Sequence, residues 1–437
     1  MIQANDDETP NTARRFLMLQ GPHGPFFAQL ARKLERTGAI VHRVGFNAGD
    51  AFFWRKNSGY IAHTRPLTYW REDLGVILSE KSITDIVLYG DTRPVHAIAI
   101  DLAHARGLRV HVFEEGYLRP YWVTYERDGS NGHSELCKMS VSDMRAKLPP
   151  APPPEPAPDH WGALRHHIFY GALYHLFVMV ANRAYRRIER HRTLSVVQEF
   201  RLYLRKLLFL PVLAIQRRRA ERRIARGGFA YHLVLLQLAH DANFIAHSPF
   251  AGMEDFLRHV IANFAASAPK HHHLVFKGHP LDDGRARTRA TVLALARAHL
   301  VDDRVHYVGG GRLGKMLDNA TSCITVNSTA AQQALWRALP LRAFGKSVYS
   351  KPEFVSNQPL TRFFAQPAGP DRLAYLDYRT FLLATSQVPG SYYSRTGRAA
   401  VLRRVVDAML ADASPYALAD QPKGREARAQ HIAAVQP

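Results

Sequence analysis

Several features are absent from this sequence or rare in it, and each absence excludes a class of protein. Only two cysteines, Cys137 and Cys323, occur in 437 residues, and neither belongs to a CxxC motif or a Cys/His cluster. A disulfide framework and a structural zinc site are therefore disfavoured, and a reducing cytoplasm is the expected environment. No Walker lysine and no GxGxxG motif is present, which disfavours a P-loop ATPase and a classical NAD enzyme.

Long hydrophobic runs are missing as well. The longest apolar stretch, IFYGALYHLFVMVA at 168–181, is interrupted by His175 and is too short to span a bilayer. The start, MIQANDDETPNTARRF, is acidic and polar where a signal peptide would carry positive charge and then an apolar core. We therefore expect a cytoplasmic protein.

Acidic residues are scarce relative to basic ones. The 58 lysines and arginines outnumber the 37 aspartates and glutamates, so the formal net charge is +21. Such a surface attracts nucleic acid, a nucleotide-bearing substrate or an anionic membrane, and charge alone does not choose among them. No RNA- or DNA-binding motif accompanies the charge, so we do not expect nucleic acid as the partner.

The chain is long enough, with 46% hydrophobic residues, for two or three compact domains. After an N-terminus at 1–14 that we expect to be disordered, strand-like apolar runs alternate with amphipathic helices throughout residues 15–148. Continuous apolar runs between helices indicate a parallel sheet that is covered on both faces. We predict an N-terminal, doubly wound α/β domain here.

The composition changes sharply after this domain. Residues 149–159 are rich in proline and predict a semi-rigid linker. Residues 160–228 are predicted to be helical and basic, because 15 arginines and lysines face three acids between 160 and 226, a surplus of +12. The run LYLRKLLFLPVLAIQRRRAERR mixes large apolar residues with dense positive charge, as a helix on an anionic membrane surface does, although a solvated arginine-rich face is the alternative.

The strand and helix alternation resumes at 229–390 and predicts a second doubly wound α/β domain. A C-terminal helix is expected within 391–413, and residues 414–437 are expected to be a disordered tail. Two Rossmann-like domains joined by a linker form a cleft, where such folds bind ligands beyond the carboxyl ends of their strands.

Two loops of the first domain carry polar residues at predicted strand ends. YGDTRPVH offers Asp91, Arg93 and His96, which suit an anion, although Asp91 could simply cap the helix that follows. VFEEGYLRP ends a strand in Glu114 and Glu115. A carboxylate there can act as a general acid or base when its pKa is raised, and adjacent strand residues point to opposite faces. At most one of the pair should face the cleft, and the other is expected to be structural, paired with Arg119.

The second domain supplies a matching carboxylate. In LQLAHDANFIAHSPF, Asp241 follows a very apolar strand and is accompanied by Asn243 and other polar residues. It could be a turn residue. One carboxylate from each domain, however, is the arrangement that glycosyl transfer uses for a nucleophile and an acid/base.

A bipartite phosphate site is predicted in the same domain. FKGHPLDDG places Lys277, His279 and Pro280 after one strand, and TVNSTAAQQAL places Asn327, Ser328 and Thr329 at a strand-to-helix junction. Ser328 or Thr329 would cap that helix with or without a ligand. The open amides and dipole of the same terminus, with cations from the first loop, would hold a phosphate.

Taken together, the ordered motifs resemble a known family. These motifs are LQGPHGPFF, LYGDTRPVHAIA, EEGYLRPYW, LLQLAHDANFIAHSPF, FKGHPLDDG and TVNSTAAQQAL. They are similar to those of capsule polysaccharide Kdo transferases of the KpsS/LipB type, over most of residues 15–365. The basic segment with its proline-rich lead and the C-terminal tail depart from the resemblance.

The resemblance implies a GT-B-like enzyme with a basic helical insert. It implies that the enzyme uses CMP-Kdo, without a metal or other cofactor, and places β-linked Kdo on a phosphatidylglycerol-type lipid to begin the poly-Kdo linker of capsular polysaccharide. It also implies retention of configuration, with Asp241 as nucleophile and Glu114 or Glu115 as acid/base. Of these two we favour Glu114, with Glu115 and Arg119 shaping the loop.

The remaining site residues follow from the same resemblance. The pair His279 and Pro280 looks like a CMP-binding motif, which Lys277, Asn327, Ser328 and Thr329 would complete. Candidate substrate-binding residues come from the other motifs: Gly21, Asp91, Arg93, His96, Arg119 and Asn243. The expected location is the cytoplasmic face of the inner membrane, with other capsule biosynthesis and export proteins as candidate partners.

Three alternatives stay open at this point. The chain could be a transferase of the same fold with another CMP-sugar or acceptor. It could be a non-catalytic scaffold or export component that binds the lipid-linked polysaccharide, in which case Asp241 would tolerate substitution. As a nucleic-acid-binding protein it would show steeply salt-dependent binding and no turnover.

Overall fold

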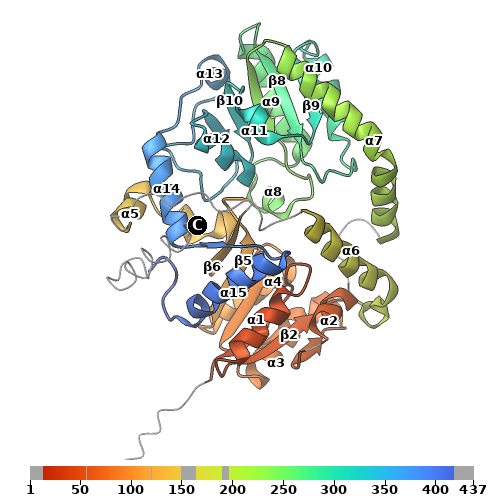
Figure 1. Ribbon diagram of the computed structural model, residues 1–437, viewed down its shortest axis with the longest axis vertical. Coiled ribbons are helices and arrows are strands. Elements are labelled where there is room, and N and C mark those ends of the chain that lie inside the picture. Colours follow the sequence, from red (N-terminus) through yellow and green to blue (C-terminus); the bar gives the residue numbers. More distant parts are fainter. Residues whose placement is uncertain (1–12, 56, 120, 149–163, 189–195, 418–437) are drawn as a thin grey trace, which may run out of the picture.

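The structure is a computed structural model that describes residues 13–55, 57–119, 121–148, 164–188 and 196–417. The predicted linker at 149–159 and most of the ends predicted to be disordered, 1–14 and 414–437, lie outside the described residues. Two α/β domains are stacked along the long axis of the molecule, each with its own sheet (Figure 1).

The N-terminal domain contains a sheet of order β12-β6-β5-β4-β1-β2-β3. The strands from β5 to β3 are parallel, β6 is antiparallel to β5, and β12 is antiparallel to β6. The strand bounds are β1 Arg15–Met18, β2 Ile40–Gly45, β3 Tyr60–Ala62, β4 Asp85–Tyr89, β5 Arg109–Glu115, β6 Trp122–Arg127 and β12 Gln387–Pro389.

Helices cover both faces of this sheet, which explains the continuous apolar runs. Successive strand residues alternate between two cores: Phe16 and Met18 belong to one, and Leu17 belongs to the other. The first core includes α1 and α15, and the second includes α3 and α4. The helix bounds are α1 Phe26–Glu35, α2 Ala48–Trp54, α3 Trp70–Glu80, α4 Pro94–Ala105, α5 Val141–Ala146 and α15 Arg395–Leu410.

The C-terminal domain contains a wholly parallel sheet of order β11-β10-β7-β8-β9. Its strands are β7 Tyr231–Leu235, β8 His273–Gly278, β9 Val305–Gly309, β10 Ser322–Thr325 and β11 Leu341–Ala343. Its helices are α8 Ala242–His247, α9 Met253–Ser267, α10 Thr288–Ala298, α11 Leu313–Leu317, α12 Gln332–Trp336 and α13 Leu360–Ala365. The predicted pair of doubly wound α/β domains is confirmed.

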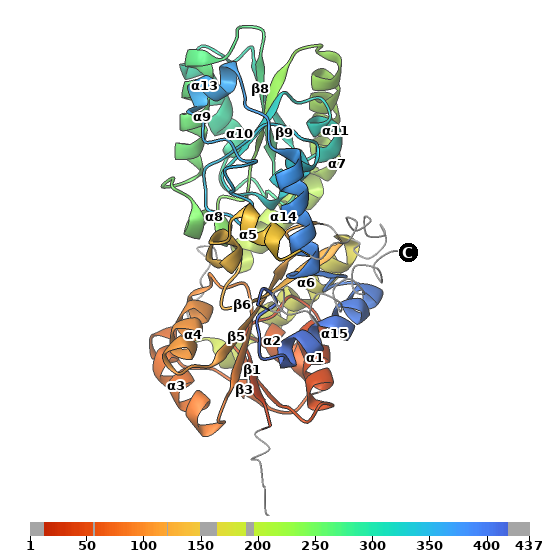
Figure 2. The same cartoon turned by 90° about the vertical axis from the view of Figure 1, so that its left-hand side faces the viewer.

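The chain returns to the N-terminal domain earlier than predicted. Helix α14 (Arg372–Ala384) crosses between the domains and packs on α5 (Figure 2). Strand β12 then joins β6, and α15 packs on α1. The predicted boundary at residue 390 is therefore corrected, because β12 completes the first sheet. Tyr416 is buried against Phe381, so the ordered chain also extends beyond the predicted start of the tail at 414.

The segment predicted at 160–228 does not form one unit in its described parts. Helix α6 (Leu164–Val180) packs on α2, where the rings of Phe177 and Phe52 stack with centroids 3.7 Å apart. Helix α7 (Val196–Arg226) instead contacts β9 of the C-terminal domain, where Ile224 is buried. Within the described part of the chain, none of the helices combines the length and apolar character that a membrane span requires.

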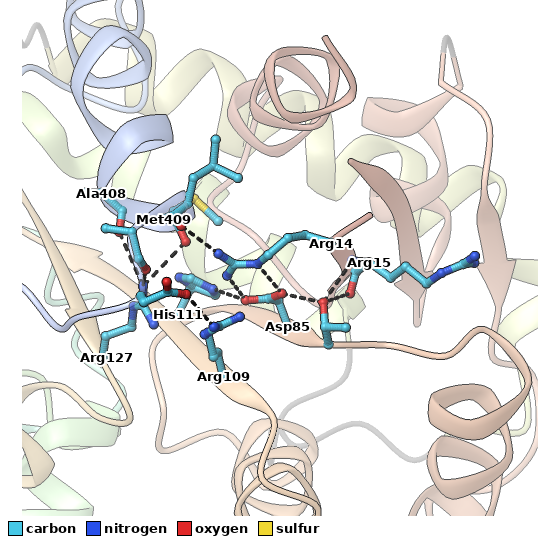
Figure 3. A network of polar contacts seen from close by, with 12 residues as sticks. Arg14, Arg15, Asp85, Arg109, His111, Arg127, Ala408 and Met409 are labelled. Carbon is cyan, nitrogen blue, oxygen red and sulfur yellow. Dashed lines mark hydrogen bonds and ion pairs between the residues drawn. The ribbon is translucent and has the colours of Figure 1, made fainter. Parts of the chain in front are cut away.

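A buried network of polar contacts holds α15 to the N-terminal sheet (Figure 3). The carboxylate of Asp85 accepts hydrogen bonds from Arg14 and from His111 Nε2, the latter at 2.8 Å. The same Arg14 donates to the carbonyl of Leu410, and Arg127 donates to the carbonyl of Ala411 at 2.7 Å. These carbonyls follow or end α15, where backbone acceptors lack partners within the helix, so two cations satisfy that terminus.

The charge states in this network follow from its surroundings. Burial opposes ionisation of Asp85, but hydrogen bonds from His111, Arg14 and Thr84 outweigh it and hold the pKa of Asp85 well below its usual range. Burial lowers the pKa of His111 to about 4. Near neutral pH, an ionised Asp85 therefore accepts from a neutral His111 that carries its proton on Nε2.

We predict that Asp85→Ala lowers the free energy of unfolding by about 3–5 kcal/mol, because it leaves the buried His111 and the partly buried Arg14 without their carboxylate partner. The folded pKa of Asp85 lies below the unfolded value of 3.8, so this stabilisation is present above that value and is lost as the pH falls through the folded pKa. Urea denaturation near neutral pH measures the loss. The control is Asp101→Ala, which removes an exposed ion pair with Arg71 and should cost under about 1 kcal/mol. Equal losses in the two variants would contradict the prediction.

Candidate active site

A cavity of about 580 Å³ lies between the domains, beyond the carboxyl ends of both parallel sheets. The N-terminal domain contributes the end of β5 and the loop that follows it. The C-terminal domain contributes the loops after β7, β8 and β10. Most of the predicted site residues line this one cavity: Glu114, Glu115, Arg119, Asp241, Asn243, Lys277, His279, Pro280, Asn327, Ser328 and Thr329.

The two glutamates lie on a hairpin that the sequence analysis did not anticipate. Strand β6 pairs antiparallel with β5, so that Glu114 lies opposite Thr124. Glu115 accepts hydrogen bonds from the hydroxyls of Tyr89 and Tyr393, at 2.9 and 3.1 Å. The predicted pairing of Glu115 with Arg119 is therefore wrong. Glu115 bonds to two tyrosines instead, and Arg119 donates to the carbonyl of Gly116.

Glu114 has the properties of a general acid/base. Its Oε1 accepts from the amide of Glu115 at 2.9 Å, and its Oε2 accepts from Asn131 Nδ2 at 3.4 Å. Burial, helped by the charges of Glu115 and Asp91, raises the pKa of Glu114 to about 7 against the opposing effects of the Glu115 amide and Arg119. A carboxyl group that titrates near neutrality can both accept and return a proton at physiological pH.

Asp241 faces the same cavity from the C-terminal domain. It is the N-cap of α8, and its Oδ1 accepts from the amides of Asn243 and Phe244, at 2.9 and 3.1 Å. Asp241 therefore does act as a turn residue that caps a helix, as the sequence had also allowed. Among the described residues no donor bonds to Oδ2, so one carboxylate oxygen is held in place while the other remains available to a ligand.

Two hydrogen-bond donors, Lys277 and His279, lie at the end of β8. Burial lowers the pKa of Lys277, against the charge of Glu221. His279 Nδ1 accepts from the amide of Leu281 at 3.1 Å, so its neutral imidazole carries the proton on Nε2. Burial lowers the pKa of His279, against the charge of Asp241. A neutral donor and an ammonium group therefore line the wall next to Asp241.

The strand-to-helix junction after β10 differs in part from its prediction. Ser328 is an N-cap, as expected, and its hydroxyl accepts from the amide of Ala330 at 3.3 Å. The capped element is only a 3-10 turn, Thr329–Ala331, that leads into the short α12. An anion at this junction would bind to individual amides and hydroxyls and would gain little from a helix dipole, because the helix is short.

Two side-chain amides form part of the wall: Asn327, which was predicted, and Gln332, which sequence reasoning missed. Asn327 Nδ2 donates to the carbonyl of Asn243 at 2.9 Å, and Gln332 Nε2 donates across the domains to the carbonyl of Tyr117 at 3.0 Å. The oxygens of both amides, Asn327 Oδ1 and Gln332 Oε1, are buried and have no partner among the described residues. Such oxygens can accept from a ligand. The pair of glutamines within the otherwise largely apolar TAAQQAL is the sequence feature that could have identified Gln332.

Four predicted residues lie outside the cavity lining. Asp91 is buried and accepts from the amide of Ser130 and from His133 Nδ1, at 2.8 and 3.1 Å. It does not cap α4, because the N-cap of that helix is Arg93. Asp91 instead holds η2 (Asn131–His133), which carries the partner of Glu114, and so acts as a positioning residue.

The other three have local contacts within the N-terminal domain. Arg93 donates to Gln20, and His96 Nδ1 lies 2.6 Å from the carbonyl of Gly90. A side chain at Gly21 would meet the ring of Phe27 at 2.7 Å, so Gly21 serves packing. Across the described ranges, no three His, Cys, Asp or Glu side chains could hold a metal ion together.

We predict that Glu114→Gln stabilises the protein more at about pH 8 than at about pH 5. The native pKa near 7 exceeds the unfolded value of 4.5, so the folded state holds its proton longer, and ionisation reduces stability as the pH rises between these values. The gain at the higher pH should be on the order of 1 kcal/mol, since the cavity side is hydrated. Thermal unfolding measures it. Glu135→Gln, at an exposed position, is the control, and an equal pH dependence in both variants would contradict the prediction.

Comparisons with known proteins agree with these motifs. The family described as capsule polysaccharide biosynthesis protein matches residues 84–393. The capsule polysaccharide export protein KpsS of Escherichia coli is 30% identical over 385 residues, covering 87% of this chain and 97% of that protein. The capsule polysaccharide modification protein LipB of Neisseria meningitidis serogroup A is 29% identical over 407 residues, covering 90% of this chain and 95% of that protein.

Among solved structures, KpsC of Thermosulfurimonas dismutans, described as a beta Kdo 2,7 transferase, aligns with 90% of this chain and 99% of that chain. The identity is 11% and the TM-score is 0.44. The family match extends over most of the sequence and includes the cavity loops, and the KpsS match covers 87% of the chain. The chain therefore belongs to the capsule polysaccharide biosynthesis protein family.

Proposed function

We propose that this chain is a retaining glycosyltransferase that moves β-Kdo from CMP-Kdo to a phosphatidylglycerol-type lipid and so begins the poly-Kdo linker of capsular polysaccharide. The observation that supports it most is the single interdomain cavity. One carboxyl group, Glu114, titrates near neutrality on one wall, while Asp241 and two cationic or hydrogen-donating side chains, Lys277 and His279, line the other. The names of the relatives add the link to capsule polysaccharide.

In the first step, Asp241 attacks the donor. Its Oδ2 bonds to the anomeric carbon of Kdo while the bond from that carbon to the CMP phosphate oxygen breaks. The bonds from Asn243 and Phe244 to Oδ1 keep the carboxylate oriented. CMP leaves as an anion, which His279 Nε2 and the Lys277 ammonium stabilise by hydrogen bonding and charge.

In the second step, Glu114 activates the acceptor. Its carboxylate takes the proton of the acceptor hydroxyl, whose oxygen bonds to the anomeric carbon as the bond to Asp241 breaks. Two inversions give net retention. A pKa of about 7 suits this role, because the group is ionised for the attack and can release the proton afterwards. No step in this scheme uses a metal or another cofactor.

Membrane association belongs to the same proposal, because the acceptor is a lipid. The C-terminal half of α7 exposes Arg217, Arg218 and Arg219, and exposed apolar side chains lie on the same helix. This combination suits the anionic cytoplasmic face of the inner membrane. A scaffold role remains the second candidate, since the name of the Escherichia coli relative refers to export.

The decisive experiment incubates the purified protein with CMP-Kdo and phosphatidylglycerol or its lyso form. Mass spectrometry should detect lipid that has gained one Kdo, and the absence of product from the wild type would overturn the proposal. Asp241→Asn should lower kcat by at least about a thousand-fold while the protein stays folded, because asparagine also caps a helix. Full activity in Asp241→Asn or Asp241→Ala would remove the assigned nucleophile, whereas lipid binding without turnover in the wild type would favour a scaffold.

The membrane role has its own test. Arg218→Glu with Arg219→Glu should weaken binding to phosphatidylglycerol vesicles by about 30-fold or more, because each basic residue near an anionic surface contributes on the order of 1 kcal/mol. Vesicle sedimentation measures the change. Lys33→Glu with Arg36→Glu makes the same charge change at exposed positions in the last turn and the C-cap of α1 and serves as the control. Equal weakening in both variants would show that net charge, and not α7, controls binding.

A further inference from the structure

A second cavity, of about 730 Å³, opens beside the active site. It lies between α7 and the loop from β8 to α10, and we call it the α7 cavity. His279 and Pro280 line this cavity and the active-site cavity alike. Anything bound in the α7 cavity would therefore end next to the reacting groups.

One face of α7 forms the apolar wall. Residues of this face that line the cavity recur at helical spacing, and four of these six are apolar: Leu202, Arg205, Phe209, Leu213, Gln216 and Ala220. Phe209 and Leu213 are 53% and 43% exposed. Leaving such side chains in water is unfavourable, so this face fits an apolar occupant. The two halves of α7 run in different directions in Figure 1, as the interior Pro211 explains.

The charges at the α7 cavity fit an anionic ligand. Three arginines line it: Arg205 and Arg217 on α7, and Arg289 on α10. Of the two acids on the opposite wall, Asp283 is paired with Arg285, and Asp282 lies beside the hydroxyl of Tyr307. Cations that surround an apolar wall match a molecule with an anionic head and a hydrocarbon tail. The volume lies within the range of small-molecule sites.

We propose that the α7 cavity binds the acyl chain of the anionic lipid acceptor, with the headgroup directed past His279 and Pro280 into the active site. This inference rests on the proposed function and adds to it a site for the tail. The acceptor would then be selected by its chain as well as by its headgroup, and α7 would be a wall of the acceptor site in addition to a membrane contact.

The test compares Leu213→Glu, inside the cavity, with Ile215→Glu, which makes the same charge change at a similarly exposed position of α7 outside the lining. Rates are measured with lysophosphatidylglycerols of short and long chain, as monomers. The wild type should prefer the long chain, and Leu213→Glu should reduce the ratio of kcat/KM for long over short chains by about 10-fold or more, since several methylenes lose their apolar contact. Ile215→Glu should keep the wild-type ratio.

A binding measurement separates this inference from the proposed function. A lysophosphatidylglycerol with a photoreactive acyl chain should label peptides within 202–220 or the loop from β8 to α10. Leu213→Glu should abolish that labelling and Ile215→Glu should retain it. Absence of turnover in the wild type would overturn the proposed function alone. The proposed acyl-chain site would be overturned by labelling of other peptides or by equal labelling in both variants. It would also be overturned if the α7 cavity bound a helix of a partner protein instead of lipid.

Discussion

The pairing of β12 with β6 is the constraint on which the active site depends. Through it the chain returns from the second domain to the first, and Gln387 on β12 accepts from the amides of Tyr117 and Leu118. The residues just after β12 continue the support: the hydroxyl of Tyr392 donates to the carbonyl of Glu114 at 2.7 Å. The wall that carries the predicted base is thus held by a segment far away in the sequence. Helix α15 follows this segment, and its buried polar contacts with the first sheet add to the stability that the short strand β12 provides.

The two carboxylates, Glu114 and Asp241, lie in different environments. Glu114 is surrounded by protein atoms and other acids, and this environment keeps it protonated to higher pH than a free glutamate. Asp241 caps α8, and the amides of Asn243 and Phe244 bind one oxygen of its carboxylate. The proposed two-step displacement would use both a glutamate with a pKa near neutrality and an aspartate whose carboxylate is held in one orientation. Each property depends on the element that carries the residue.

Particular residues show how far sequence reasoning reached. Buried parallel strands leave continuous apolar runs, so β1, β4, β5, β7 and β8 could be anticipated, and with them the loops that carry Asp241 and His279. Strand β6 was missed because its sequence, WVTYER, mixes polar and apolar residues although all six are buried. Strand β12 was missed because it has only three residues and pairs with a strand remote in the sequence. Asp91 was placed in the site by its strand-end position, but its carboxylate supports the loop behind Glu114. The role of Glu115 changed for a similar reason, since Tyr393 comes from beyond β12.

By itself the sequence determined the alternation that makes two parallel sheets, the basic charge, and the polar residue types at strand ends, because these depend on local composition and period. Only the tertiary structure distinguished the environments of the two adjacent glutamates and raised the pKa of Glu114, because a pKa depends on burial and on neighbours contributed by other segments. The same holds for the two cavities that meet at His279 and Pro280. Their walls come from helices and loops that no local pattern brings together.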